Sequence, residues 1–80
     1  MENLVTYNNV FKESFAIDEE RLVGLKYQDI PEWDSVGHMA LMTSLEESFG
    51  IEMEIDDIID FSSYEKGIEI LTKYNIVLNE

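Results

Sequence analysis

The chain has 80 residues, with 18 Asp and Glu against 5 Lys and Arg and a formal net charge of -13. Such a charge repels nucleic acid and anionic membranes and favours partners with basic faces. With 45% hydrophobic residues we expect one folded domain, residues 1–80, whose modest core leaves little room for a deep catalytic cleft. A binding, carrier or adaptor module is therefore expected rather than an enzyme.

The chain has no cysteine, which excludes disulfides and thiolate metal sites and fits a reducing compartment. Residues 1–7 lack the basic region and long apolar run of a signal peptide. No stretch reaches the roughly 20 apolar residues of a membrane span. We therefore expect a cytoplasmic monomer.

Apolar residues recur at three- and four-residue intervals over residues 3–15, which predicts a helix with one apolar face. These residues are Leu4, Tyr7, Val10, Phe11 and Phe15. Residues 16–34 contain Gly24 and the one proline, Pro31, and predict a long connector with room for one short turn. The side chains expected to pin this connector are Ile17, Leu22, Val23, Leu25, Tyr27, Ile30 and Trp33.

A second helix is predicted over residues 35–49, because Asp34 and Ser35 are good cap residues and Gly50 suits a left-handed stop. Its core stripe is expected to hold His38, Leu41, Met42, Leu45 and Phe49. A second, semi-apolar side holds Val36, Met39, Ala40 and Thr43. This side is either a surface for a partner or ordinary exposed apolar surface.

Residues 51–55 alternate between apolar and polar but have no partner strand, so an extended connector is expected. Asp56 is expected to cap a short third helix over residues 57–61. Ser62 and Glu65 fit a capping box for a fourth helix that ends near residue 74. The side chains that it should bury are Tyr64, Ile68, Leu71 and Tyr74. The predicted fold is all-α, a small four-helix bundle with a long loop between its first two helices.

Two kinds of chemistry near Ser35 are disfavoured by the residues themselves. A serine nucleophile elbow needs a preceding strand and a glycine where this chain has Trp33, and the one histidine, His38, lies a helical turn later. A calcium-binding loop needs alternating carboxylates and a central glycine, which the acidic run of residues 52–60 lacks. Neither a hydrolase nor a dedicated metal site is expected.

Residues 34–41 read DSVGHMAL, and LEE at 45–47 and FGI at 49–51 follow. This sequence resembles the acyl carrier protein family, which has an Asp-Ser-Leu motif at the start of its second helix and a Leu-Glu-Glu-x-Phe-Gly-Ile-like stretch after it. The likeness extends over the whole chain in length, acidity and expected helix order. It implies an acyl-carrier-protein-like bundle without catalytic activity of its own.

The resemblance implies that Ser35 carries 4′-phosphopantetheine, placed there by a separate phosphopantetheinyl transferase, and presents acyl groups as thioesters. Asp34 would help to steer the transferase and its metal. A helix N-terminus favours the anionic phosphodiester, and the thiol that the chain lacks would arrive with the group. The alternative is that both residues only cap their helix, which contributes about 1 kcal/mol.

The resemblance also implies two further surfaces. One faces partners with basic docking patches, namely acyl-activating enzymes, synthases and acyltransferases, and holds Val36, Met39, Glu46, Glu47, Asp56 and Asp57, with Asp60 beside them. The other is an acyl pocket between the second and third helices, with Leu41, Leu45, Phe49, Ile58, Ile59 and Ile68. The alternatives are purely structural: a solvated helix face for the first set and an ordinary bundle core for the second. Trp33 is expected to anchor the long loop, and His38 to pack.

Several functions remain open within this resemblance. Peptidyl carriers usually show two glycines before a His-Ser or Asp-Ser pair, which residues 32–35 lack, whereas a D-alanyl carrier is compatible with the motif. Carriers of general fatty-acid biosynthesis commonly hold two acidic residues and a methionine where this chain has Gly37, Ala40 and Thr43. That difference implies a specialised pathway, and the alternative is neutral drift on an exposed helix face. An acidic helical interaction domain that carries nothing is the alternative from another class.

Overall fold

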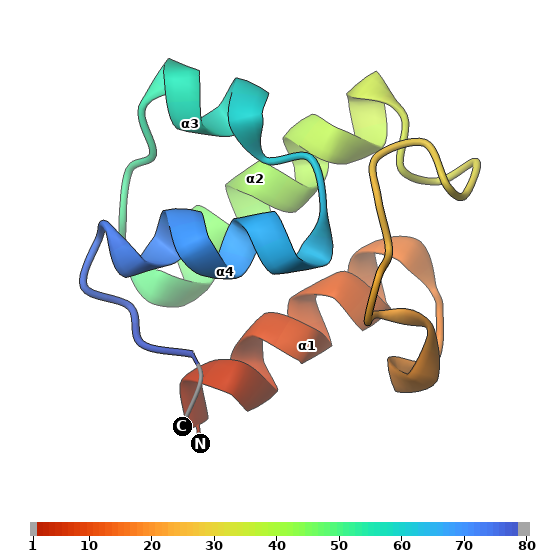
Figure 1. Ribbon diagram of the computed structural model, residues 1–80, viewed down its shortest axis with the longest axis horizontal. Helices are drawn as coiled ribbons and strands as arrows, with labels where there is room; N and C mark the ends of the chain where they lie inside the picture. Colours follow the sequence, from red (N-terminus) through yellow and green to blue (C-terminus); the bar gives the residue numbers. More distant parts are fainter. Residues whose placement is uncertain (1, 79–80) are drawn as a thin grey trace.

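The computed structural model describes residues 2–78 (Figure 1). Along the chain it forms α1 (Glu2–Phe15), the 3-10 helix η1 (Glu19–Arg21), α2 (Ser35–Phe49), α3 (Ile55–Asp60) and α4 (Tyr64–Thr72). Within the described residues there are four α-helices and no strand, which confirms the expected all-α class. In Figure 1, α1 lies at the bottom, α4 crosses the middle of the molecule with part of α2 behind it, and α3 lies at the upper left.

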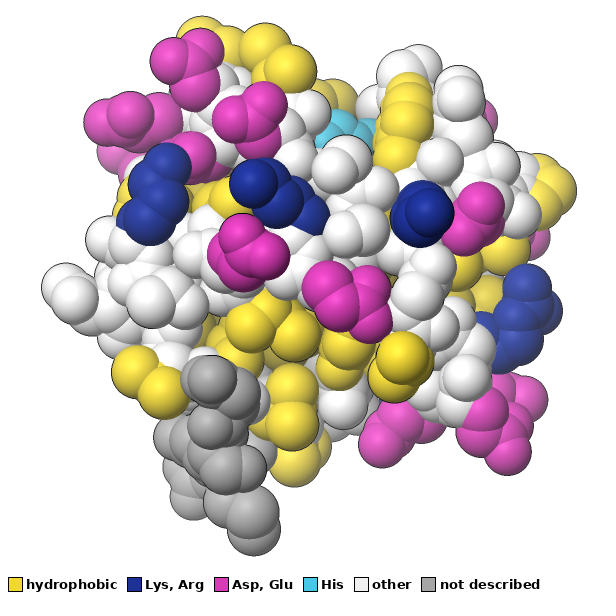
Figure 2. Space-filling model, viewed as in Figure 1, with side chains coloured by type: hydrophobic (Ala, Val, Ile, Leu, Met, Phe, Trp, Pro, Cys, Tyr) yellow, Lys and Arg dark blue, Asp and Glu magenta, His cyan; other side chains and the backbone are white. Residues whose placement is uncertain are grey.

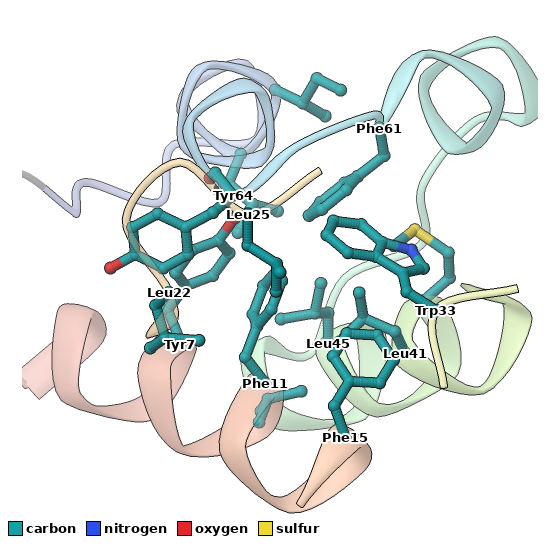
Figure 3. Packing of buried hydrophobic residues seen from close by; sticks show 14 of the residues in the cluster. Tyr7, Phe11, Phe15, Leu22, Leu25, Trp33, Leu41, Leu45, Phe61 and Tyr64 are labelled. Atoms are coloured by element: carbon teal, nitrogen blue, oxygen red, sulfur yellow. Dashed lines mark hydrogen bonds between the residues drawn. The ribbon is translucent and has the colours of Figure 1, made fainter. Parts of the chain in front are cut away.

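The core is built around the aromatic face of α1. Phe11 is fully buried, and its ring centroid lies within 6.3 Å of the rings of five other aromatic residues. These are Tyr7, Phe15, Trp33, Phe61 and Tyr64 (Figure 3). Aromatic pairs at such separations add stabilisation beyond the area that they bury. The hydroxyl of Tyr7 donates to the carbonyl oxygen of Tyr64 at 2.7 Å, which ties α1 to α4 and satisfies a buried polar group.

The long connection between α1 and α2 is pinned both by side chains and by backbone pairing. Leu22, Leu25, Ile30 and Trp33 are buried as expected, and Ile17 packs against the core. Val23 was expected to pin the loop as well, but this prediction is wrong because its side chain is 78% exposed. The other anchors are backbone hydrogen bonds between residues 25–27 and 62–64, from Tyr27 N to Ser62 O and from Tyr64 N to Leu25 O, both 2.9 Å.

Helix α2 begins and ends where its cap residues predict. The side chain of Asp34 accepts a hydrogen bond from the backbone N–H of Gly37 at 2.8 Å, and Gly50 ends the helix with φ of 65°. Its core side buries Leu41, Met42 and Leu45. The opposite side is exposed, as expected from the spacing of Val36, Met39, Ala40 and Thr43.

The short helices differ from the predictions in their first residues. Helix α3 begins at Ile55 with Glu54 as its N-cap, so Asp56 lies inside the helix and does not cap it. Helix α4 is capped by Ser63, whose hydroxyl accepts from Lys66 N at 2.9 Å, and not by Ser62. With Ser63 as the cap, the third residue of the helix is Lys66, so the capping box with Glu65 does not form. Glu65 instead accepts a hydrogen bond from the backbone N–H of Gly24 at 2.8 Å.

Candidate functional site

Ser35 is the first residue of α2, and its side chain is exposed. Asp34 caps the first turn of α2, because its side chain accepts from Gly37 N and its carbonyl oxygen accepts from His38 N at 2.7 Å. The hydroxyl of Ser35 is therefore presented at the N-terminal end of a 15-residue helix. The helix dipole and the N–H groups of this first turn favour an anion there.

Gly37 lets the long loop approach the first turn of α2. A β-carbon at this position would collide with the backbone carbonyl of Glu32, which cannot move away as a flexible side chain can. The close approach of the chain's own loop is therefore the reason for a glycine at this position.

An apolar hollow of about 320 Å³ lies directly beside Ser35. Its walls come from the loop, the first turns of α2, α3 and the connection to α4. The lining residues are Tyr27, Ser35, His38, Met39, Ile58, Ile59, Phe61 and Ser62. Small-molecule sites are usually concave and mostly apolar, with a small number of polar groups.

The residues expected to form an acyl pocket are divided between this hollow and the core. Ile58 and Ile59 line the hollow. Leu41 and Leu45 are fully buried in the core (Figure 3), and Phe49 and Ile68 are half-buried against it. The fully buried leucines contact other core side chains and do not face the hollow beside Ser35.

His38 connects three parts of the chain through its two ring nitrogens. Trp33 Nε1 lies 2.9 Å from Nδ1, and the carbonyl oxygen of Ile58 lies 2.8 Å from Nε2. An indole N–H can only donate, so Nδ1 accepts and Nε2 carries the proton and donates to Ile58 O. His38 thus joins the loop, α2 and α3 through its two ring nitrogens. Neither nitrogen is left to take a proton from Ser35.

The expected acidic surface is present but smaller than predicted. Glu47 and Asp56 are exposed, and in Figure 2 acidic side chains gather at the upper left, where Figure 1 places α3. Glu46 is half-buried, and its carboxylate accepts from Met53 N at 2.8 Å. It therefore fixes the connection from α2 to α3 as well as contributing charge.

Asp57 is the residue that the sequence places wrongly. It was expected on the partner surface, but it is only 3% exposed. Its carboxylate accepts hydrogen bonds from Lys73 Nζ and the Tyr74 hydroxyl, both at 2.5 Å. These two hydrogen bonds, from Lys73 first, lower the pKa of Asp57 below its usual value of 3.8. Asp57 fastens α3 to the end of α4 and is not available to a partner.

Four lining residues of the hollow, Tyr27, His38, Phe61 and Ser62, were not expected at the site from the sequence, which predicted only loop pinning for Tyr27 and packing for His38. Tyr27 and Ser62 meet through the backbone pairing of two segments more than thirty residues apart, for which the sequence offers no local signal. Phe61 offered a signal: an aromatic residue at the predicted end of the third helix, directly before Ser62, was available to close the space between α3 and α4.

Among residues 2–78, no set of three or more His, Asp and Glu side chains converges as a metal site. No helix of this part of the chain is long and apolar enough to cross a membrane. In comparisons with protein-family models, curated proteins and solved structures, none matches this chain.

Proposed function

We propose that this protein is an acyl carrier whose Ser35 holds a 4′-phosphopantetheine arm. One observation supports this most: an exposed serine, at the start of a capped helix, borders an apolar hollow of about 320 Å³. The sequence around it, Asp34-Ser35-Val36 with Leu45-Glu46-Glu47 downstream, resembles the acyl carrier protein motif. Neither observation alone specifies a carrier, but together they account for the position of the serine.

The residues around Ser35 fit the proposed group chemically. The hydroxyl is accessible to a transferase, and the helix N-terminus suits the phosphodiester that the modification would leave. Met39, Ile58 and Ile59 offer apolar contacts within reach of an arm attached at Ser35. The arm would supply the thiol on which an acyl group is carried. The chain would bind, present and shelter the group, with no catalysis of its own.

Exposed residues of α2 and α3 supply a docking surface for partner enzymes. Val36 is 77% exposed and Met39 is 52% exposed in the first turns of α2, and the exposed Glu47, near the end of α2, and Asp56, on α3, add negative charge. We propose that this surface meets basic faces of a phosphopantetheinyl transferase and of acyl-activating, synthase and acyltransferase enzymes. The carrier would work as a cytoplasmic monomer.

Two related functions fit the same surface. A D-alanyl or other aminoacyl carrier would use Ser35 in the same way. The exposed Val36 and Met39 are also compatible with an acidic interaction domain that is never modified. Transfer of phosphopantetheine from coenzyme A, followed by intact mass, separates any carrier from such a domain. Comparing acyl with aminoacyl loading of the modified chain then separates the two carriers.

A further inference from the structure

We propose that His38 closes the inner end of the hollow beside Ser35 and so restricts its cargo to short acyl chains. This inference rests on the proposed carrier function, because it concerns the group that the arm of Ser35 would bring. It assigns to His38 a specificity-determining role and to the site a substrate class.

The ring of His38 lies at the boundary between the hollow and the core. It lines the hollow, and its centroid is 5.5 Å from the ring of Tyr27 and 6.2 Å from that of Phe61. On its other side it stacks on Trp33 at 6.2 Å with an interplanar angle of 16°. Trp33 is fully buried and is not among the lining residues. In Figure 2 the one histidine (cyan) is visible between hydrophobic side chains on either side.

Hydrogen bonds hold this ring in place. Because Trp33 donates to one nitrogen and the other donates to the carbonyl oxygen of Ile58, the ring cannot turn aside without losing both partners. The indole N–H belongs to a fully buried side chain, so leaving it without an acceptor is costly. The same two bonds span from the loop through α2 to α3, which are the walls that a longer chain would have to part.

The space beyond His38 is already filled. Leu41 and Leu45, which follow His38 on the core side of α2, are fully buried in the core cluster together with Trp33. The hollow is about 320 Å³. An acyl chain that fills it has no further apolar space to enter, so additional methylenes would remain in water or displace core side chains.

The test uses the full chain loaded at Ser35 with an acetyl, butyryl, hexanoyl, octanoyl or decanoyl arm, by a broad-specificity transferase and the matching acyl-coenzyme A. The midpoint of thermal unfolding of each form is compared with that of the same protein carrying the free thiol, so that any effect of the arm itself cancels. In the native chain the midpoint should rise with the shorter acyl groups and level off before decanoyl. A midpoint that keeps rising through decanoyl would overturn the proposal.

Two variants and a control place the limit at His38. With His38→Ala the rise should continue through octanoyl and decanoyl, whereas His38→Gln, which can still accept from Trp33 and donate to Ile58, should retain the native limit. Thr43→Ala, exposed on the same helix, should also retain it. A native limit in the His38→Ala variant would contradict the assignment.

A second measurement remains informative even if His38→Ala does not fold. In the native chain, backbone amide shifts that depend on acyl length should be confined to the hollow, at Ile58, Ile59 and Met39. Length-dependent shifts that reach Leu41 and Leu45 would overturn the proposal. Failure of Ser35 to accept any arm would instead overturn the carrier function, so the two failures are distinct.

Discussion

The carbonyl oxygen of Glu32 occupies the space that a β-carbon on Gly37 would need. The first turn of α2 therefore packs directly on the backbone of the long loop, two residues after Ser35 and beside the cap made by Asp34. In this chain the glycine has a steric cause within the fold. Its difference from the acidic residue of general fatty-acid carriers thus reflects the path of the loop as well as any choice of partner.

Gly37→Ala is expected to destabilise the protein by about 1–3 kcal/mol, the usual cost of forcing extra atoms into packed space. A glycine in an unobstructed helix would behave oppositely, since alanine is favoured there by up to about 1 kcal/mol. Chemical denaturation measures the free energy of unfolding. Thr43→Ala, exposed on the same helix, is the control and should change it by less than about 0.5 kcal/mol. A Gly37→Ala protein as stable as the native one would contradict this packing.

Asp57 should make stability depend on acid pH. Its pKa is lowered by the hydrogen bonds from Lys73 and Tyr74, so the unfolded state binds protons more readily than the folded state. The stabilisation is therefore fully present above the ordinary pKa of 3.8 and is lost as pH falls through the lowered pKa. Asp57→Asn should lower the free energy of unfolding near neutral pH by about 1–3 kcal/mol, because buried hydrogen bonds to a charged group are lost.

The measurement for Asp57 is denaturation of the native chain and of Asp57→Asn between pH 7 and pH 2. The difference in free energy of unfolding between the two proteins should be constant down to the region of pH 4 and should then shrink. Asp56→Asn is the matched control, because Asp56 is an exposed carboxylate in the same helix. A difference for Asp57→Asn that does not change with pH would show that its carboxylate is not stabilised in the folded state.

Much of this fold follows from local signals in the sequence. Helix α2 was predicted at both ends, because Asp34 and Gly50 each act on the turn beside them. The start of α4 and the burial of Asp57 were missed for a shared reason. The Glu65 carboxylate accepts a hydrogen bond from Gly24 N, and the Asp57 carboxylate accepts from Lys73 and Tyr74. Each of these partners lies far away in the sequence.

The candidate site divides in the same way. Ser35, Met39, Ile58 and Ile59 lie on helices whose positions were predicted, and the structure brings them to one hollow. The part formed by Tyr27 and Ser62 depends on backbone pairing between the loop and the start of α4. The spacing of apolar residues in the sequence does not predict such pairing. Those contacts depend on tertiary packing, which a single sequence does not reveal.

Association with a basic partner should be steered by charge. The double variant Glu47→Lys with Asp56→Lys should slow association with a phosphopantetheinyl transferase by about tenfold at low salt. Raising salt from 0.1 M to 1 M should remove most of the difference in association rate between the native chain and this variant, since the Debye length falls from about 10 Å to about 3 Å. Glu46 is unsuitable for this test, because its carboxylate also holds Met53 N.

The control for steering is Asp18→Lys with Glu20→Lys, which changes the net charge equally but at exposed positions around η1. Figure 1 shows this segment at the lower right, on the other side of the molecule from α3. Stopped-flow fluorescence of a labelled transferase gives the association rates. Equal slowing by both double variants, or no dependence on salt, would contradict a local docking surface.

If the carrier serves a specialised pathway, Ala40 and Thr43 should reduce its use by the enzymes of general fatty-acid synthesis. Both are exposed on α2, so they can be replaced without the collision that Gly37→Asp would create. Ala40→Glu with Thr43→Met should raise turnover by fatty-acid elongation enzymes by about tenfold, in competition with a general carrier, which corresponds to about 1.4 kcal/mol. Equal turnover of the native chain and the general carrier would oppose a specialised pathway.

The central claim, attachment at Ser35, is tested most directly by intact mass spectrometry after incubation with coenzyme A and a broad-specificity phosphopantetheinyl transferase. The native chain should gain one phosphopantetheinyl mass, mapped to Ser35 by fragmentation. Ser35→Ala should gain none while keeping the native helical circular dichroism, and Ser48→Ala, which removes another exposed hydroxyl from α2, should gain the full mass. A native chain whose mass stays unchanged, under conditions that fully modify a known carrier, would contradict the account.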